Sequence, residues 1–282
     1  MRLATLHEEP KPEGERRRPG DLIGELREQF PSLDSYLHRF DIDTHDLHLL
    51  GSGNQGSAYS DGKYVVKFTE DTQEVKASAR LLEKPVRGVN PIIHVGEFSR
   101  PIIWHKGVFD DDDVGRDSQF YVIIQDLQST NLSPEERAVA NVVGNFLVSY
   151  FHREESERHQ RGEGLIALIN KFEHMGNGIP RLIKILAEKS LTDGKYKIPV
   201  TDESIAIAEK LLEAVINMYL QAGIRFFDVQ ADNVAKDRDG NFVLIDIGVS
   251  TTKGRVPPYG IVESEFKNRG AHRFYHAIEI IN

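Results

Sequence analysis

Short apolar runs separated by turn residues dominate the first half of the chain, a pattern typical of β-strands. Residues 47–68 hold such runs on either side of Asp61-Gly62, which is a strong signal for a hairpin turn. We therefore expect three antiparallel strands there. A short helix over TQEVKASARLLE should follow, with further strands at IIHVGEF, PIIWH and FYVIIQDL. Ahead of them, residues 21–40 carry apolar positions at helical spacing and predict two short helices broken near Pro31.

Helical periodicity replaces this pattern in the second half. Ser133-Pro134-Glu135-Glu136 is typical of a capped helix start. A second long helix is predicted from about Thr201 to Ala222, before Gly223, and another around LIKILAEK. Two short strands around an Asp-Gly turn follow, the second in VLIDIG. This order predicts an α+β chain with two lobes, which we place at residues 21–127 and 128–282, behind a flexible N-terminal segment of residues 1–20.

Composition narrows the classes of function. The formal net charge of −9 argues against nucleic acid or an anionic membrane as a partner. No apolar run approaches the roughly 18 to 20 residues that span a bilayer. The chain has no cysteine, which excludes disulfides and thiolate metal sites and is typical of a cytosolic protein. We therefore expect a cytoplasmic protein that binds neither nucleic acid nor membranes.

A glycine cluster between two predicted strands is the first candidate site. Gly51, Gly53 and Gly56 would let backbone N–H groups approach phosphate oxygens, because glycine has no Cβ to keep a ligand away. A glycine-rich hairpin without a ligand would explain the same residues, so this cluster alone does not predict phosphate binding.

Lys67 is the second candidate. It ends the strand KYVVK beyond the glycine cluster and could reach the phosphates that the cluster covers. A carboxylate would have to hold it in position. Glu74, early in the next helix, is the candidate partner, and Glu83 is the rival.

Three polar residues in the second half carry a family resemblance. Asn233 follows Asp228 by five residues, and Asp246 follows Asn233 by thirteen, within Asp246-Ile247-Gly248. Behind the glycine cluster and VVK, this D-x-x-x-x-N and D-[apolar]-G order resembles the catalytic and metal-binding loops of protein kinases and their small-molecule relatives. The resemblance covers about residues 47–250. It implies a bilobal protein-kinase-like fold, with an antiparallel-sheet N-terminal lobe that holds one helix and a reduced helical C-terminal lobe.

The resemblance also implies a role for each matching residue. Asp228 would accept the proton of the substrate hydroxyl, with Lys67 and Asn233 as the other catalytic residues. Asn233 and Asp246 would hold magnesium. ATP would be bound by the glycines at its phosphates, by the lysine with its carboxylate partner, and by the linker after FYVIIQDL at its adenine: Gly51, Gly53, Gly56, Lys67, Glu74, Gln125 and Leu127. The implied cofactors are ATP and Mg²⁺.

Other positions depart from the kinase pattern. Phe226-Phe227 stand where kinases have His-Arg, Gln230 where Ser/Thr kinases have lysine, and Ile247 where the metal loop has phenylalanine. Only 34 residues follow Gly248, without an Ala-Pro-Glu sequence, which leaves little room for activation-loop regulation and for the usual peptide-docking surface. This compact form resembles the early kinases of lytic bacteriophages and related bacterial proteins.

Three functions remain open at this point. The intact lysine and the three polar residues favour a Mg-ATP-dependent Ser/Thr protein kinase that acts on cytoplasmic proteins, those of the host if the chain is phage-encoded. The short spacing from the glycines to Lys67, together with Gln230, also suits a small-molecule kinase of the aminoglycoside-phosphotransferase type. Phe226-Phe227 and the acidic net charge suit a pseudokinase that acts as an interaction or inhibitor protein. The sequence names neither the substrate nor the oligomeric state.

Overall fold

The computed structural model describes residues 21–53, 56–99, 102–103, 117–156, 165–193, 198–247, 260–261 and 278–281. The predicted flexible segment 1–20 and Gly248 of the predicted metal loop lie outside these ranges.

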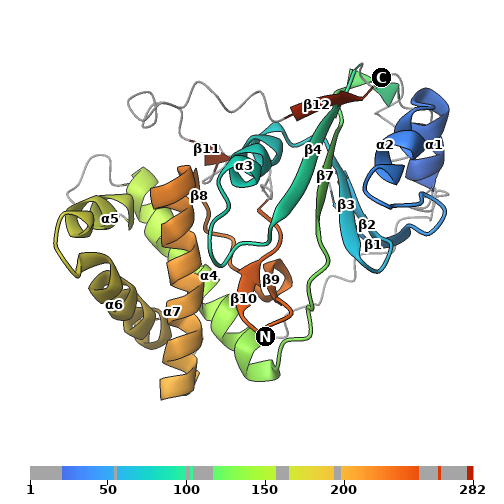
Figure 1. Ribbon diagram of the computed structural model, residues 1–282. Coiled ribbons are helices and arrows are strands. Elements are labelled where there is room, and N and C mark those ends of the chain that lie inside the picture. The colour runs from blue at the N-terminus through green and yellow to red at the C-terminus, as the bar shows by residue number, and fades with distance from the viewer. Residues whose placement is uncertain are drawn as a thin grey trace, which may run out of the picture.

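A six-stranded sheet forms one half of the molecule (Figure 1). Its neighbouring strands are antiparallel, except that β12 runs parallel to β4. In sheet order the strands are β1 His48–Gly53, β2 Gly56–Ser60, β3 Tyr64–Thr69, β7 Tyr121–Asp126, β4 Ile92–Phe98 and β12 Ile278–Ile281. Three smaller pairs are β5 Ile102–Ile103 with β6 Asp117–Ser118, β8 Ile224–Arg225 with β11 Gly260–Ile261, and β9 Val234–Lys236 with β10 Phe242–Leu244.

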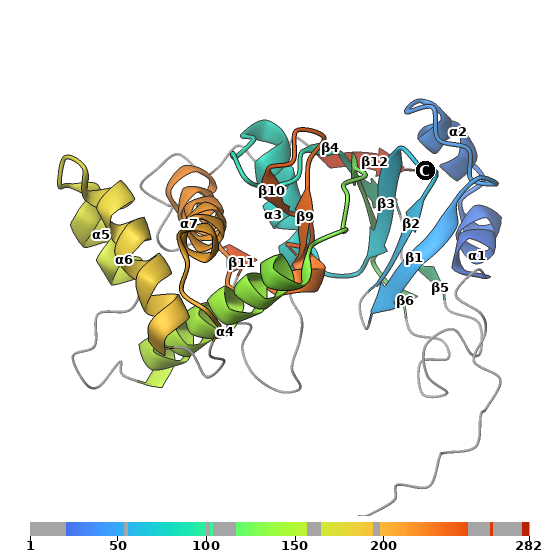
Figure 2. The same cartoon turned by 90° about the horizontal axis from the view of Figure 1, so that it is seen from below.

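Helices cover the sheet and form the other half. They are α1 Asp21–Gln29, α2 Leu33–His38, α3 Thr72–Glu83, α4 Pro134–Ser156, α5 Leu165–Glu173, α6 Gly178–Asp193 and α7 Asp202–Asn217. A π-helical turn, η2 Met218–Ala222, continues α7, and a 3₁₀ turn, η3 Ala231–Asn233, precedes β9. Figure 2 shows α5 and α6 at one end, then α7, then α3 with β9 and β10, then the sheet, and finally α1 and α2. The chain thus has the α+β architecture that its sequence predicts.

The turn between β2 and β3 forms as its Asp-Gly pair predicts. Asp61 Oδ1 accepts a hydrogen bond from the backbone N–H of Lys63 at 2.8 Å. Gly62 has a φ of 91°, which residues with a Cβ rarely adopt. The three antiparallel strands expected within residues 47–68 are present.

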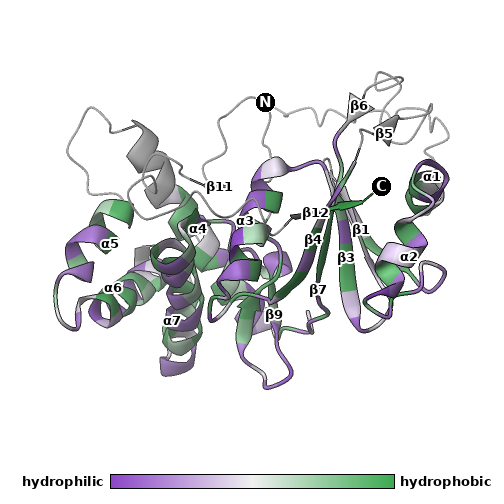
Figure 3. Cartoon of the chain, turned by 45° about the horizontal axis from the view of Figure 1, so that its top comes forward, coloured by the Kyte–Doolittle hydropathy of each residue, from purple (hydrophilic) through white to green (hydrophobic). Residues whose placement is uncertain are grey.

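Alternation along β3 gives the sheet two different faces. Val66 and Phe68 are buried in an apolar cluster with residues of α1 and α2, which cover that face. Successive side chains of a strand point to opposite faces, so Lys67 lies on the other one. In Figure 3 the strands β4 and β7 are coloured mainly as hydrophobic, as expected for strands with both faces covered.

Capping residues define the two long helices of the second half. Ser133 and Glu136 form a reciprocal pair at the start of α4, in which each side chain accepts a hydrogen bond from the other's backbone N–H. Thr201 and Ser204 do the same at the start of α7. Gly223, with a φ of 70°, ends the helical run that η2 extends.

The end of the chain corrects one expectation. The sequence predicts that residues 128–282 form a helical lobe, but β12 adds a strand to the main sheet, with Ile278 opposite Val95. Ile281 is 2% exposed and Ile280 is 53% exposed, as the alternation of a strand with one buried face requires. The main sheet is therefore built from both ends of the described chain.

Candidate active site

Lys67 lies at the centre of a charged cluster drawn from three parts of the chain. Its Nζ lies 2.5 Å from Oε1 of Glu74 and 3.1 Å from Oδ1 of Asp246. Lys67 comes from β3, Glu74 from the first turn of α3, and Asp246 from the segment after β10. The cluster therefore connects the sheet with the segment in which the sequence predicts a metal ligand.

The start of α3 fixes Glu74. Asp71 caps this helix, and its carboxylate accepts hydrogen bonds from two backbone N–H groups of the first turn, including that of Glu74. Thr69 Oγ1 donates to Glu74 Oε2 at 3.1 Å, while the other carboxylate oxygen receives Lys67. Glu83, the rival partner in the sequence, is exposed at the far end of α3. Of the two candidates, the structure places Glu74 against the lysine.

Burial governs the protonation of this cluster. Glu74 is 4% exposed, and its burial, opposed by the charge of Lys67, raises its pKa to about 7. Burial alone would lower the pKa of Lys67, but the carboxylates of Glu74 and Asp246 outweigh it and raise that pKa above its ordinary value. Lys67 therefore stays positively charged at neutral pH, whereas Glu74 changes its charge in that range.

The segment between β8 and β9 forms the second part of the site. Asn233 Nδ2 donates to the carbonyl oxygen of Asp228 at 2.9 Å, which closes the loop between these two residues. The backbone N–H of Ile245 donates to the carbonyl oxygen of Asn233 at 3.0 Å, and Ile245 directly precedes Asp246. Asn233 is thus bonded both to Asp228 and to the backbone beside Asp246.

Asn233 and Asp246 fit the chemistry of a magnesium site. Because the Asn233 amide donates through Nδ2, its oxygen is the atom suited to a hard cation, and Asp246 supplies a carboxylate. Magnesium is usually held by one or two carboxylates together with substrate phosphates. Within the ranges that the structure describes, no group of three or more His, Asp or Glu side chains could hold a metal by itself. A magnesium ion held by Asn233 and Asp246 would complete its coordination with water or with phosphate oxygens.

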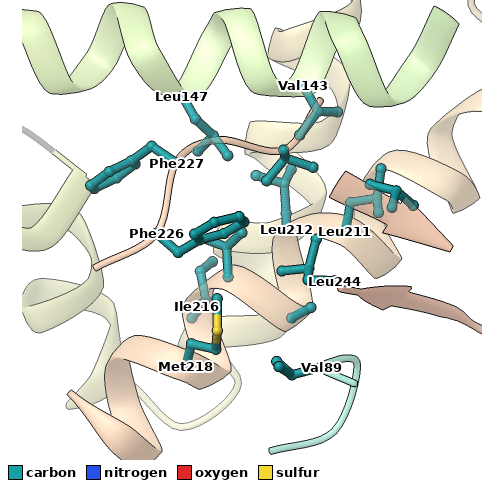
Figure 4. Packing of buried hydrophobic residues seen from close by; sticks show 14 of the residues in the cluster. Val89, Val143, Leu147, Leu211, Leu212, Ile216, Met218, Phe226, Phe227 and Leu244 are labelled. Atoms are coloured by element: carbon teal, nitrogen blue, oxygen red, sulfur yellow. The ribbon is translucent and has the colours of Figure 1, made fainter. Parts of the chain in front are cut away.

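Two buried aromatic rings anchor the loop that carries Asp228. Phe226 and Phe227 are each 1% exposed and belong to a large apolar cluster, where Figure 4 shows them among residues such as Leu147 of α4 and Ile216 of α7. Burial of one such ring contributes roughly 1.5–3 kcal/mol. The positions at which kinases hold His-Arg are therefore apolar anchors in this chain.

The three glycines of the β1–β2 hairpin differ in whether contacts within the protein require glycine at their positions. A Cβ at Gly56 would lie 2.1 Å from the carbonyl oxygen of Phe68, so the pairing of β2 with β3 already requires glycine there. Among the described residues, no atom lies within 4 Å of a Cβ built at Gly51. Gly53 ends β1 opposite Gly56. Contacts within the protein thus explain Gly56 and leave Gly51 without a structural reason.

The strand expected to contact adenine is already hydrogen-bonded. The backbone N–H of Leu127 donates to the carbonyl oxygen of Lys63 at 3.1 Å. Gln125 is 9% exposed and pairs with Val65 and Ile92 inside the sheet. The N–H of Leu127 is therefore already engaged, because the pairing between β3 and β7 continues one residue past the end of β7.

Asn90 joins three segments near the site through hydrogen bonds, and the sequence analysis did not predict this role. Its Nδ2 donates to the carbonyl oxygen of Asp126 at 2.9 Å, and its Oδ1 accepts from Gln128 Nε2 at 2.8 Å. Its backbone N–H donates to the carbonyl oxygen of Leu244 at 2.8 Å, two residues before Asp246. Asn90 is 2% exposed and connects the linker after β7 with the strand that leads to Asp246. A lone asparagine next to a proline signals only a turn.

Comparisons with known proteins add little to this geometry. No protein-family model matches the chain, and no curated protein matches it. A solved structure of APH(2")-IIia in complex with GDP and kanamycin is similar over 80% of this chain and 71% of that chain, with 14% sequence identity and a TM-score of 0.29. Both values are low, so the geometry of this chain, and not that likeness, carries the functional proposal.

None of the helices within the described ranges combines the length and the apolar character needed to cross a membrane.

Proposed function

We propose that this chain is a Mg-ATP-dependent phosphotransferase. The observation that carries the proposal is the contact of Lys67 with both Glu74 and Asp246. Lys67 and Asp246 are 179 positions apart in the sequence. Burial of Lys67 and Glu74 costs desolvation free energy, and a role in binding phosphate would explain why the pair is kept. A lysine held by a helix carboxylate, next to a metal-binding aspartate, is the arrangement that positions nucleotide phosphates in protein kinases.

Each residue of the site has its own role in this proposal. Lys67 binds phosphate oxygens and stabilises their charge. Asn233 and Asp246 would hold Mg²⁺, which would neutralise charge on the transferring phosphoryl group. Asp228 accepts the proton of the attacking hydroxyl. The hydrogen bond from Asn233 to the carbonyl oxygen of Asp228 fixes these two groups relative to each other.

Two kinds of hydroxyl group are candidates for the phosphoryl acceptor. The kinase resemblance implies a Ser or Thr hydroxyl of a cytoplasmic protein. Gln230, which is exposed, replaces the lysine of Ser/Thr kinases, and the buried Phe227 replaces an arginine. Both changes remove a cation from the neighbourhood of Asp228, and they favour the second candidate, a hydroxyl of a small molecule such as an aminoglycoside.

The test is transfer of label from γ-labelled ATP with Mg²⁺, supplied separately with a protein extract and with a protein-free mixture of metabolites and aminoglycosides. We expect transfer in one of the two, which identifies the acceptor. Asp228→Asn should abolish transfer and leave ATP binding intact, while the matched change Asp239→Asn, in the exposed β9–β10 turn, should leave transfer unchanged. ATP binding without transfer to either mixture would contradict the proposal and indicate a pseudokinase.

A further inference from the structure

We propose that Asn141 and Gly144 of α4 are positioning residues, which set where the loop between Asp228 and Asn233 lies; the proposed consequence for catalysis rests on the function proposed above. Neither residue belongs to the sequence pattern that identified the site. Both contact the backbone of this loop, and both lie on one helix that begins right after the linker from the sheet.

Asn141 holds the middle of the loop. Its Oδ1 accepts a hydrogen bond from the backbone N–H of Ala231 at 2.9 Å. Ala231 lies three residues after Asp228 and two before Asn233, so this bond fixes the loop between its two functional side chains. Loss of this bond, in a partly buried place, would leave the backbone N–H of Ala231 unsatisfied and the loop free to shift.

Gly144 sets how closely the helix approaches the loop. A Cβ at this position would lie 2.5 Å from the carbonyl oxygen of Val229 and 2.9 Å from its carbonyl carbon. Val229 directly follows Asp228, and its backbone cannot yield without moving the aspartate. Glycine inside a helix is less stable than alanine, so its presence in α4 needs a reason. The close approach to Val229 supplies one.

The contacts of α4 with this segment follow a regular order. As the residue number rises along α4, the number of its partner falls: Glu136 with Lys236 at 2.6 Å, Arg137 with Asp232 at 3.4 Å, Asn141 with Ala231 and Gly144 with Val229. Residues 136–144 of the helix therefore run antiparallel to residues 229–236. The Arg137–Asp232 pair is long and the aspartate side chain is 89% exposed, so it contributes little. Asn141 and Gly144 are left as the two contacts nearest Asp228.

The variants are Asn141→Leu, which removes the acceptor, Asn141→Asp, which keeps it, and Gly144→Ala, which adds the Cβ. Asn145→Leu is the matched control, because Asn145 is an exposed asparagine of the same helix whose Nδ2 donates to the carbonyl oxygen of Asn141 within α4. Two quantities are measured: amide hydrogen exchange of the peptide that contains residues 229–233, and kcat and KM for ATP in the transfer assay.

We expect Asn141→Leu to accelerate exchange at Ala231 at least about fivefold, since the lost bond costs about 1 kcal/mol or more. A displacement of catalytic groups by a fraction of an ångström to 1 Å should lower kcat about ten- to a hundredfold in Asn141→Leu and Gly144→Ala. KM for ATP should change less than kcat, because Lys67 and the glycines, which hold the nucleotide phosphates, lie outside this loop. Asn141→Asp should restore exchange and kcat, and Asn145→Leu should resemble the wild type.

Equal exchange in the wild type and Asn141→Leu would overturn the proposal, and so would equal effects of Asn141→Leu and Asn145→Leu. A rise in KM for ATP with unchanged kcat would also overturn it. If the wild type transferred no phosphate, the proposed function would fail, but exchange at Ala231 would still decide whether Asn141 positions the loop.

Discussion

The ion-pair clusters around Lys67 and around Arg39 each join distant parts of this chain, and they differ in burial. Lys67 and Glu74 expose 18% and 5% of their side chains. Arg39 and Glu279 expose 49% and 37%, although their contact is bidentate, at 2.5 and 2.6 Å. The first cluster connects the sheet with the segment after β10, and the second connects Arg39, the residue after α2, with β12. Both bridge segments that are far apart in sequence, yet only the first is removed from water.

This difference in burial separates a candidate functional cluster from a structural one. Desolvation of a buried ion pair can exceed the Coulombic gain, so burial of Lys67 and Glu74 is weak evidence for stability. It is better evidence for function, because perturbed pKa values gather at functional sites. The exposed pair of Arg39 and Glu279 is screened by water and needs no such explanation. The following predictions test this contrast.

The largest expected effect follows removal of the buried cation. Lys67→Met should lower kcat/KM about 100- to 1000-fold, the range found when one preorganised electrostatic contact is lost. The fold should persist at pH 7, because without Lys67 the buried carboxyl of Glu74 takes up a proton and avoids being an unpaired charge. Transfer kinetics and urea unfolding measure both quantities. Arg39→Met, the matched change in the exposed cluster, should leave kcat/KM unaltered, and equal losses in the two variants would refute the contrast.

A smaller effect concerns pH. Burial, opposed by Lys67, raises the pKa of Glu74 to about 7, so Glu74 is ionised above this pH and neutral below it. Only the ionised form pairs with the charged Lys67. Below pH 7 the competent fraction falls tenfold per unit, so the affinity for Mg-ATP should fall by up to about tenfold per unit between pH 7 and pH 5.

Isothermal titration with Mg-ATP across pH 5 to 8 measures this dependence. Glu74→Gln carries no titrating group and should show weak affinity with a flat profile. Glu83→Gln is the control, since this exposed residue of the same helix should leave the profile of the wild type in place. If the affinity for Mg-ATP still changed near pH 7 in Glu74→Gln, the titrating group would be one other than Glu74.

Local signals in the sequence predicted much of this arrangement. The Asp-Gly turn and the period of two predicted that Lys67 lies on a strand among apolar neighbours, and the structure adds that α1 and α2 cover the opposite face. Helical spacing predicted α3, and Glu74 follows from its place in the first turn. Asp71, just before this helix, carried an N-cap signal that could have been used to rank Glu74 above Glu83.

The long-range contacts could not be predicted from the sequence. β12 has four residues, too few for periodicity to show, and its parallel pairing with β4 depends on a chain end returning to the sheet. The bond that occupies the Leu127 N–H depends on where the pairing between β3 and β7 stops. Gly144 gave a usable signal, since an isolated glycine in a helical pattern often marks close packing, but its partner Val229 could not be named.

The smallest effect is expected at the exposed cluster. Glu279→Gln removes the charge that Arg39 binds and that lies 3.1 Å from Nε2 of His94. The unfolding free energy should fall by less than about 1 kcal/mol, discounted for the exposure of both side chains. The loss should shrink further in 1 M salt, where the screening length is about 3 Å.

Hydrogen bonding to Arg39 lowers the pKa of Glu279. The stabilisation that the ionised Glu279 contributes is therefore present above the ordinary glutamate pKa and is lost as pH falls through the lowered value. Urea unfolding at pH 7, at low pH and in high salt measures all three quantities, with kcat and KM for ATP unchanged. A loss of several kcal/mol, or a fall in kcat, would show that β12 supports the site and that burial alone does not separate the two clusters.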